Sequence, residues 1–156
     1  MPRRVDQASL LIPASPGRLW QAWVEPEELT QWLTLPGMRA QIEVMEPRPG
    51  GAFRGRIVAD DPAPAPGTAA PPPFVMDARY EHLDPPHAFT LTVTFAPEDQ
   101  AFADRMLLEW RYAPRAGGTL VTITASHAPG IVHVDHQSNF VTLLDNLARH
   151  VAAHPD

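Results

Sequence analysis

The sequence predicts an α+β fold: an antiparallel sheet of about seven strands, two short helices and a long C-terminal helix. Seven segments alternate apolar and polar residues with a period of two, which is typical of strands with one buried and one solvated face. The last segment, 136–151, instead repeats apolar residues at three- and four-residue steps, as an amphipathic helix does. A chain of 156 residues fits one domain, 1–156, which buries roughly 70% of the surface of its unfolded chain.

The N-terminal part is expected to contain one strand followed by two short helices. The strand covers 5–12 and is ended by a proline. Ser15 and the proline after it predict the start of a helix, because a serine hydroxyl can accept a free backbone amide and proline suits the first helical position. Pro26 starts a second helix, and Glu27 and Glu28 lie in its first turn, near the positive end of the helix dipole.

Six more strands are expected before the C-terminal helix: 40–44, 53–57, 74–83, 89–95, 106–112 and 120–126. In the first of these, Ala40, Ile42 and Val44 share the apolar face. Two glycines at 117–118 predict a tight hairpin turn between the last two strands. The segment 61–73 holds six prolines and is expected to be an extended loop insertion between two strands.

The C-terminal helix, 136–151, is expected to cover the dry face of the sheet. Asp135 is the expected N-cap, and a helix of sixteen residues spans about 24 Å, enough to cross a sheet of this size. Its apolar face consists of Phe140, Leu143, Leu144, Leu147 and Val151.

The charge and composition exclude several kinds of function. The chain has 12 basic and 18 acidic side chains, a net charge of −6 and no basic stripe, so we do not expect nucleic acid as a partner. Lysine and cysteine are both absent, which excludes a Schiff-base lysine, a zinc–thiolate site and a disulfide. Because the sequence has neither a signal-peptide pattern nor an apolar run of about 18 residues, we expect a cytoplasmic protein without a membrane span.

The histidines and acidic residues do not form a recognisable metal or catalytic site. His127, His133 and His136 lie within ten residues, but only the last two have a spacing compatible with a helix. We therefore expect a solvated loop here, and neither a metal nor another cofactor. Glu109 and Arg111 share one face of a strand and are expected to form a surface ion pair.

Short phrases along nearly the whole chain, roughly residues 6 to 152, point to a known family by their order. They are Ile12-Pro13-Ala14-Ser15-Pro16-Gly17-Arg18-Leu19-Trp20, Leu29-Thr30-Gln31-Trp32, Pro49-Gly50-Gly51-Ala52-Phe53, Tyr80-Glu81-His82-Leu83-Asp84-Pro85-Pro86, Gly117-Gly118-Thr119-Leu120-Val121-Thr122-Ile123-Thr124, and His136 ahead of Leu144-Asp145-Asn146-Leu147. This order resembles the helix-grip superfamily (START-like, Bet v-like, SRPBCC), in its branch related to the activator of the heat-shock protein 90 ATPase. The chain departs from that branch in two places: Asn139-Phe140 replaces a Gly-Trp pair, and the 61–73 segment replaces a tight Asp-Gly turn.

The resemblance implies a curved sheet wrapped around the long helix, with a cavity between them. We therefore expect non-catalytic binding of a small, mostly apolar molecule. The hydroxyl of Tyr80 and the indoles of Trp32 and Trp110 are expected to orient it. The residues expected to line the cavity are Trp32, Phe53, Tyr80, Phe89, Leu91, Trp110, His136, Phe140 and Leu144.

Two other classes of function stay open. The first is a protein-interaction module, for which the resemblance implies a chaperone as the partner. The second is a cyclase- or hydrolase-like enzyme that uses the same pocket, although the sequence identifies no catalytic residue. A monomer and a homodimer are both compatible with the sequence.

Overall fold

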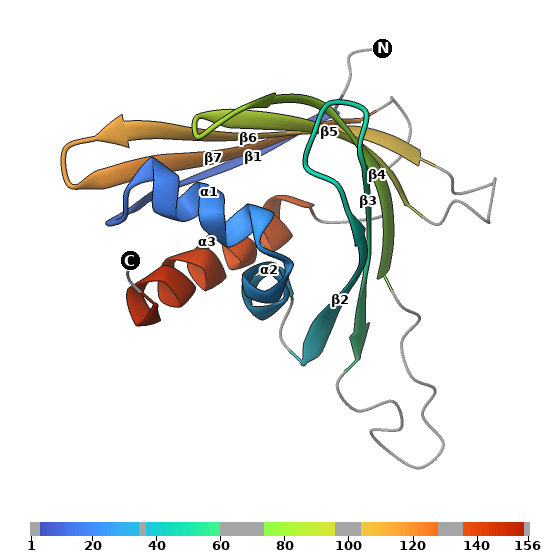
Figure 1. Ribbon diagram of the computed structural model, residues 1–156, viewed down its shortest axis with the longest axis horizontal. Helices are drawn as coiled ribbons and strands as arrows, with labels where there is room; N and C mark the ends of the chain where they lie inside the picture. Colours follow the sequence, from blue (N-terminus) through green and yellow to red (C-terminus); the bar gives the residue numbers. More distant parts are fainter. Residues whose placement is uncertain (1–3, 35–36, 60–73, 96–103, 128–135, 155–156) are drawn as a thin grey trace.

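Figure 1 shows the computed structural model, which describes residues 4–34, 37–59, 74–95, 104–127 and 136–154. The elements, in chain order, are β1 (Arg4–Ile12), α1 (Pro16–Val24), α2 (Pro26–Trp32), β2 (Met38–Met45), β3 (Ala52–Ala59), β4 (Phe74–Asp84), β5 (Ala88–Phe95), β6 (Asp104–Arg115), β7 (Gly118–His127) and α3 (His136–Ala153). The predicted segment 61–73 and the predicted N-cap Asp135 lie outside the described residues.

The seven strands form one antiparallel sheet in the order β1-β7-β6-β5-β4-β3-β2. The sheet bends over the three helices, and α3 runs below its concave side beside α1 and α2 (Figure 1). This arrangement confirms the predicted helix-grip fold. Among the described residues, no helix combines the length and the apolar character that crossing a membrane requires.

The two short helices begin where the sequence predicts. The Oγ of Ser15 accepts the backbone amide of Arg18 at 3.1 Å, which satisfies one of the free donors of the first turn of α1. Pro26 is the first residue of α2. Since a single residue separates the helices, they lie at an angle to each other (Figure 1). The buried apolar side chains of both helices belong to the same core as the inward residues of the sheet.

The hairpin between β6 and β7 requires glycine at both positions that the sequence singled out. Gly117 has a φ of +87°, a left-handed conformation that side chains rarely adopt. A Cβ on Gly118 would overlap the carbonyl oxygen of Ile12, at the end of β1. The turn thus lets the chain pass close to the backbone that leads into α1.

The apolar face of α3 packs on the concave side of the sheet, as predicted. Leu144 and Leu147 are almost fully buried, and Phe140 and Val151 are each 5% exposed. The helix packs mainly against β1 and more lightly against β7, whose inward residues belong to the same hydrophobic core. Burying such side chains contributes about 1.5–3 kcal/mol each relative to leaving them exposed, so this face holds the helix against the sheet.

The prediction of one apolar face on β2 is wrong at the end of that strand. The register against β3 shifts between Ile42 and Val44, which marks a β-bulge and changes the face to which the following residues point. Val44 is therefore 39% exposed, whereas Met45 packs against the core. Alternation in the sequence could not reveal this shift, because a bulge breaks the period of two.

Candidate functional site

A cluster of aromatic side chains fills the space between the sheet and the two short helices. Strands β3 to β6 deliver some of these rings from their inward faces, and α1 and α2 deliver the others. All of them are buried except Trp20, which is partly exposed. The cluster, which we call the aromatic interior, consists of Trp20, Trp23, Trp32, Phe53, Tyr80, Phe89, Trp110 and Tyr112.

Phe89 lies at the centre of the aromatic interior. Its ring centroid is within 6.4 Å of five other rings, at 4.6 Å from Trp23, 5.8 Å from Trp20, 5.9 Å from Trp110, 6.2 Å from Tyr112 and 6.4 Å from Tyr80. It stands opposite Trp110 in the register of β5 and β6, and those two rings stack at an interplanar angle of 12°. Because the rings are in mutual contact, a guest molecule enters only if some of them move.

The polar atoms of the aromatic interior differ in whether they have a partner. The Nε1–H of Trp23 donates to Tyr80 Oη at 3.0 Å, and the Nε1–H of Trp32 donates to the carbonyl oxygen of Ala22 at 3.0 Å. Trp110 Nε1 and Tyr112 Oη are buried and have no hydrogen-bond partner among the residues that the structure describes. These two atoms are exceptions, because nearly all buried polar groups are hydrogen-bonded and an unpaired one costs about 1–3 kcal/mol.

Both buried tyrosines keep their protons. Burial raises the pKa of Tyr80 far above its ordinary value, and the hydrogen bond from Trp23 only partly opposes this. Burial likewise raises the pKa of Tyr112, and its proximity to Tyr80 adds to the effect. The aromatic interior therefore offers neutral hydrogen-bonding groups in apolar surroundings rather than a base.

Eight of the nine predicted site residues are buried in one hydrophobic core. Trp32, Phe53, Tyr80, Phe89 and Trp110 belong to the aromatic interior, and the side chains of Leu91, Phe140 and Leu144 are buried around it. The backbone of His136 begins α3, but its side chain is outside the described part of the structure.

Two side chains of the aromatic interior, Trp32 and Tyr112, need comment beside the predicted polar groups. The indole of Trp32 is not available to a guest, because it already donates to the carbonyl oxygen of Ala22. Tyr112 was not among the predicted site residues, although it lies two residues after Trp110 and so shares its inward face on β6. That spacing was the signal that could have found it.

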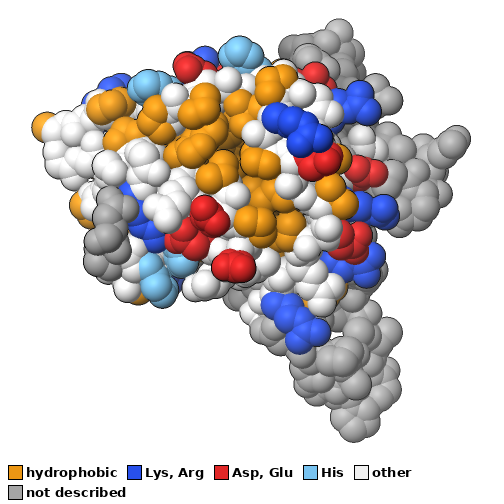
Figure 2. Space-filling model, in the orientation of Figure 1, with side chains coloured by type: hydrophobic (Ala, Val, Ile, Leu, Met, Phe, Trp, Pro, Cys, Tyr) orange, Lys and Arg blue, Asp and Glu red, His pale blue; other side chains and the backbone are white. Residues whose placement is uncertain are grey.

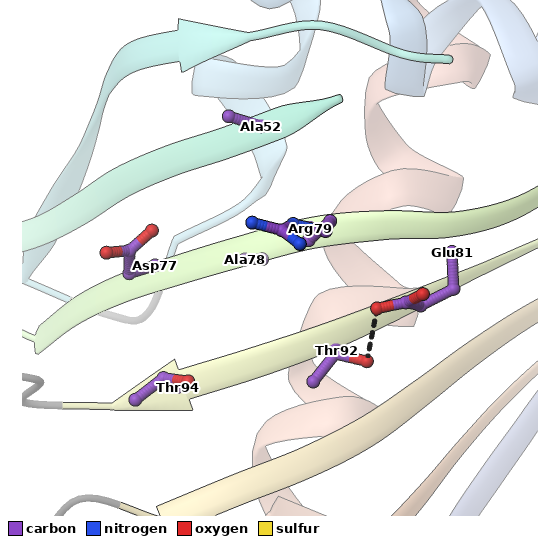
Figure 3. Close-up of a pocket in the computed structure, with 7 residues that line it drawn as sticks. All are labelled: Ala52, Asp77, Ala78, Arg79, Glu81, Thr92 and Thr94. Carbon is purple, nitrogen blue, oxygen red and sulfur yellow. Dashed lines mark hydrogen bonds between the residues drawn. The ribbon is translucent and has the colours of Figure 1, made fainter. Parts of the chain in front are cut away.

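A hollow of about 340 Å³ lies on the outer, solvated face of the sheet (Figure 3). Strand β4 supplies most of its polar groups, and Thr92 on β5 donates to Glu81 at 2.9 Å. The lining residues are Ala52, Asp77, Ala78, Arg79, Glu81, Thr92 and Thr94. None of the predicted site residues is among them, so this hollow is separate from the aromatic interior.

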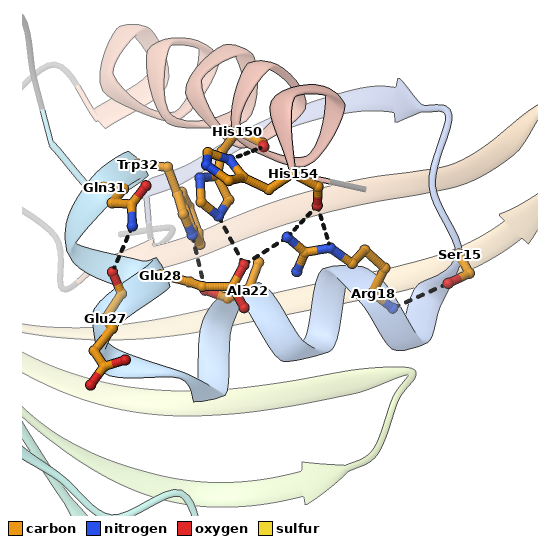
Figure 4. A network of polar contacts seen from close by, with 9 residues as sticks. All are labelled: Ser15, Arg18, Ala22, Glu27, Glu28, Gln31, Trp32, His150 and His154. Carbon is orange, nitrogen blue, oxygen red and sulfur yellow. Dashed lines mark hydrogen bonds and ion pairs between the residues drawn. The ribbon is translucent and has the colours of Figure 1, made fainter. Parts of the chain in front are cut away.

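A polar cluster joins α1, α2 and the C-terminal end of α3 (Figure 4). Arg18, which is only 6% exposed, donates from Nη2 to Glu28 Oε1 at 2.7 Å, and from Nη2 and Nε to the carbonyl oxygen of His154 at 2.7 and 3.0 Å. His150 Nε2 lies 2.9 Å from the same Glu28 oxygen. Burial raises the pKa of Glu28, but the hydrogen bonds and the electrostatic attraction of Arg18 and His150 together outweigh burial and lower the pKa below its ordinary value. The cluster fixes the helices relative to one another.

The structure also describes the predicted surface ion pair and part of the histidine group. The ion pair of Glu109 and Arg111 is confirmed, with Oε1 and Nε 2.8 Å apart at the surface. His133 lies outside the described residues, as do the side chains of His127 and His136. Within the described part, no group of three His, Cys, Asp or Glu side chains could hold a metal ion.

Solved structures share this fold at low sequence identity. Protein CV1439 from Chromobacterium violaceum is 21% identical, with a TM-score of 0.80 and coverage of 97% of this chain and 98% of its own. An AHSA1-like protein from Aeromonas hydrophila is 17% identical, with a TM-score of 0.74 over 96% of this chain and 93% of its own. DynU16, a protein of the dynemicin biosynthetic locus, is 16% identical, with a TM-score of 0.66 over 95% of this chain and 47% of its own.

A match to a protein-family model identifies the family of this chain. A search of curated proteins finds no match. The family model described as "Activator of Hsp90 ATPase homolog 1-like protein" matches residues 13–152, which is most of the chain and includes every ring of the aromatic interior. Together with the helix-grip fold, this match establishes that the chain belongs to the family of Activator of Hsp90 ATPase homolog 1-like proteins, a START-like family.

Proposed function

We propose that the chain binds a small, mostly apolar molecule in its aromatic interior and does not transform it. The observation that carries this proposal is the pair of buried atoms Trp110 Nε1 and Tyr112 Oη, for which the described part of the chain provides no hydrogen-bond partner. A buried polar group without a hydrogen-bond partner calls for an explanation in a folded protein. A bound molecule that supplies the missing hydrogen bond is one such explanation.

The surroundings of these two atoms support the same proposal. Aromatic rings give a guest a large apolar contact area, while a few polar groups fix its orientation, which is the usual composition of a ligand site. The raised pKa values of Tyr80 and Tyr112 leave both hydroxyls neutral, so they suit hydrogen bonding rather than proton abstraction.

The test is native mass spectrometry of the purified chain, before and after incubation with a cellular lipid extract. The proposal expects a non-covalent adduct that survives purification or appears after incubation, and it expects Trp110→Ala to weaken that adduct. Leu107→Ala is the matched control, because Leu107 lies on the outer face of the same strand and is 42% exposed. A wild-type spectrum with no adduct in either condition contradicts the proposal.

A second candidate is a protein-interaction module that docks on a chaperone of the heat-shock protein 90 type. It is favoured by the description of the matched family and by the surface of the molecule. Figure 2 shows hydrophobic side chains gathered in the upper middle of the face seen in Figure 1. The test is the ATPase rate of the purified chaperone with and without this chain. If this candidate is right, the rate changes, and it changes equally with the Trp110→Ala variant.

A further inference from the structure

We infer that the molecule bound in the aromatic interior carries an uncharged hydrogen-bond acceptor, such as a ketone oxygen, and that Trp110 selects for it. This inference rests on the proposed function, because it specifies the chemistry of the ligand at that same site. It makes Trp110 a specificity-determining residue.

The donor chemistry of Trp110 sets the kind of ligand group. An indole Nε1–H can only donate, so its missing partner must be an acceptor. Rings of Trp23, Trp32 and Phe89 surround the indole of Trp110 at centroid distances of 5.3, 5.6 and 5.9 Å. The N–H is thus held in apolar surroundings, where a ligand without an acceptor leaves the desolvation cost of the N–H in place.

Tyr112 provides a second donor close to the first. Trp110 and Tyr112 project from the same face of β6, two residues apart, which separates their Cα atoms by about 7 Å. Both rings contact Phe89. A ligand ring that displaces the side chain of Phe89 therefore lies within reach of both donors.

The charges of the described core indicate that the acceptor is uncharged. The buried polar or charged side chains among the described residues are Asp6, Arg18, Thr119 and His150, so Arg18 is the one arginine in this group. Arg18 already pairs with Glu28 and with the carbonyl oxygen of His154. His150 likewise lies 2.9 Å from Glu28, so among the described residues a ligand carboxylate in the aromatic interior would find no uncommitted buried cation, and an unpaired buried charge is costly.

Three probes that share one ring system test the inference: 9-fluorenone, fluorene and fluorene-9-carboxylate. Each is titrated into protein labelled with ¹⁵N-tryptophan, whose four indole N–H signals report binding and are assigned by substitution. We expect 9-fluorenone to bind about tenfold more tightly than fluorene and to move the Trp110 indole signal downfield, as a new hydrogen bond does. Fluorene-9-carboxylate should bind most weakly.

Two matched tryptophan variants separate the hydrogen bond from ring packing. Trp110→Phe keeps a ring but removes the donor, so it should bind fluorenone and fluorene about equally. Trp32→Phe should keep the preference for fluorenone, because the indole of Trp32 donates to Ala22 and not to a guest. Tyr112→Phe, the smallest change in the cluster, should reduce the preference without abolishing it.

The outcomes distinguish the inference from the proposed function. Equal binding of fluorenone and fluorene by the wild type, or tightest binding of the carboxylate, overturns the inference and leaves the proposed function standing. Binding of none of the three probes, together with a native mass spectrum free of adducts, overturns both. If Trp110→Phe does not fold, the wild-type preference and the shift of the Trp110 signal decide the question, with Tyr112→Phe as the second variant.

Discussion

Replacing Phe89 by alanine should cost more stability than most other single truncations in this chain. The side chain is fully buried and its ring contacts five others. Truncating a buried phenylalanine costs about 3–5 kcal/mol, and each aromatic pair contributes about 0.5–1.5 kcal/mol beyond its buried area. Since the pair energies overlap, we expect a loss of about 5 kcal/mol in the free energy of unfolding, which is a large part of the stability of an ordinary domain.

Urea unfolding followed by tryptophan fluorescence measures this loss. With an m-value of about 2 kcal/mol/M, a loss of about 5 kcal/mol lowers the midpoint by about 2.5 M and leaves the m-value unchanged. Phe89→Leu, which keeps most of the volume, should lose less than half as much. Leu107→Ala, at an exposed position on β6, should change stability by about 0.5 kcal/mol at most. A Phe89→Ala loss no larger than that of Leu107→Ala would falsify the central place given to this ring.

Three further predictions concern the contacts that hold the helices and the hairpin. Arg18→Met should lower the free energy of unfolding, measured in urea, by about 3 kcal/mol. The substitution leaves the carboxylate of Glu28 without its arginine partner and the carbonyl oxygen of His154 without the guanidinium that donates to it. Because the folded-state pKa of Glu28 is lowered, its ionisation stabilises the fold above the unfolded-state pKa, and this contribution should disappear as the pH falls through the folded-state pKa. Unfolding of Glu28→Gln between pH 3 and 7 should show a weaker acid-side loss than the wild type, and an identical pH profile would contradict this. Gly118→Ala should lower the free energy of unfolding by more than about 1 kcal/mol, because its Cβ meets the backbone of Ile12, whereas Gly17→Ala in open space should not be destabilising.

The fold was predictable because its signals are local. The alternation along the strands, Ser15 before α1 and the glycines of the β6–β7 turn each act within a few residues, and the structure agrees with them except at the end of β2. The bulge in β2 was not predictable, because it depends on pairing with β3 and moves Val44 to the surface. The strands of the sheet can therefore be predicted from local sequence patterns, whereas the β-bulge in β2 depends on how that strand pairs with β3.

The sequence predicted part of the membership of the aromatic interior, but not the contacts within it. Alternation places Phe89 and Trp110 on the inward face, but it cannot tell which ring becomes the centre of the cluster. It also cannot tell that the indole of Trp32 is satisfied by Ala22, since that contact depends on the angle between α1 and α2. His150 lies three residues after Leu147, a spacing that shares one face of α3, but its partner Glu28 lies far away in the sequence, so no local pattern indicated this contact.

The most direct test compares the unfolding free energy of ligand-free wild type and Tyr112→Phe. If no group of the protein forms a hydrogen bond with the Tyr112 hydroxyl, replacing the tyrosine by phenylalanine removes the desolvation cost of that hydroxyl and leaves the packing of the ring intact. The variant should then be more stable than the wild type by about 1 kcal/mol. A variant less stable than the wild type by a similar amount would mean that the folded chain already satisfies this hydroxyl, and the case for an outside molecule completing the interior would fail.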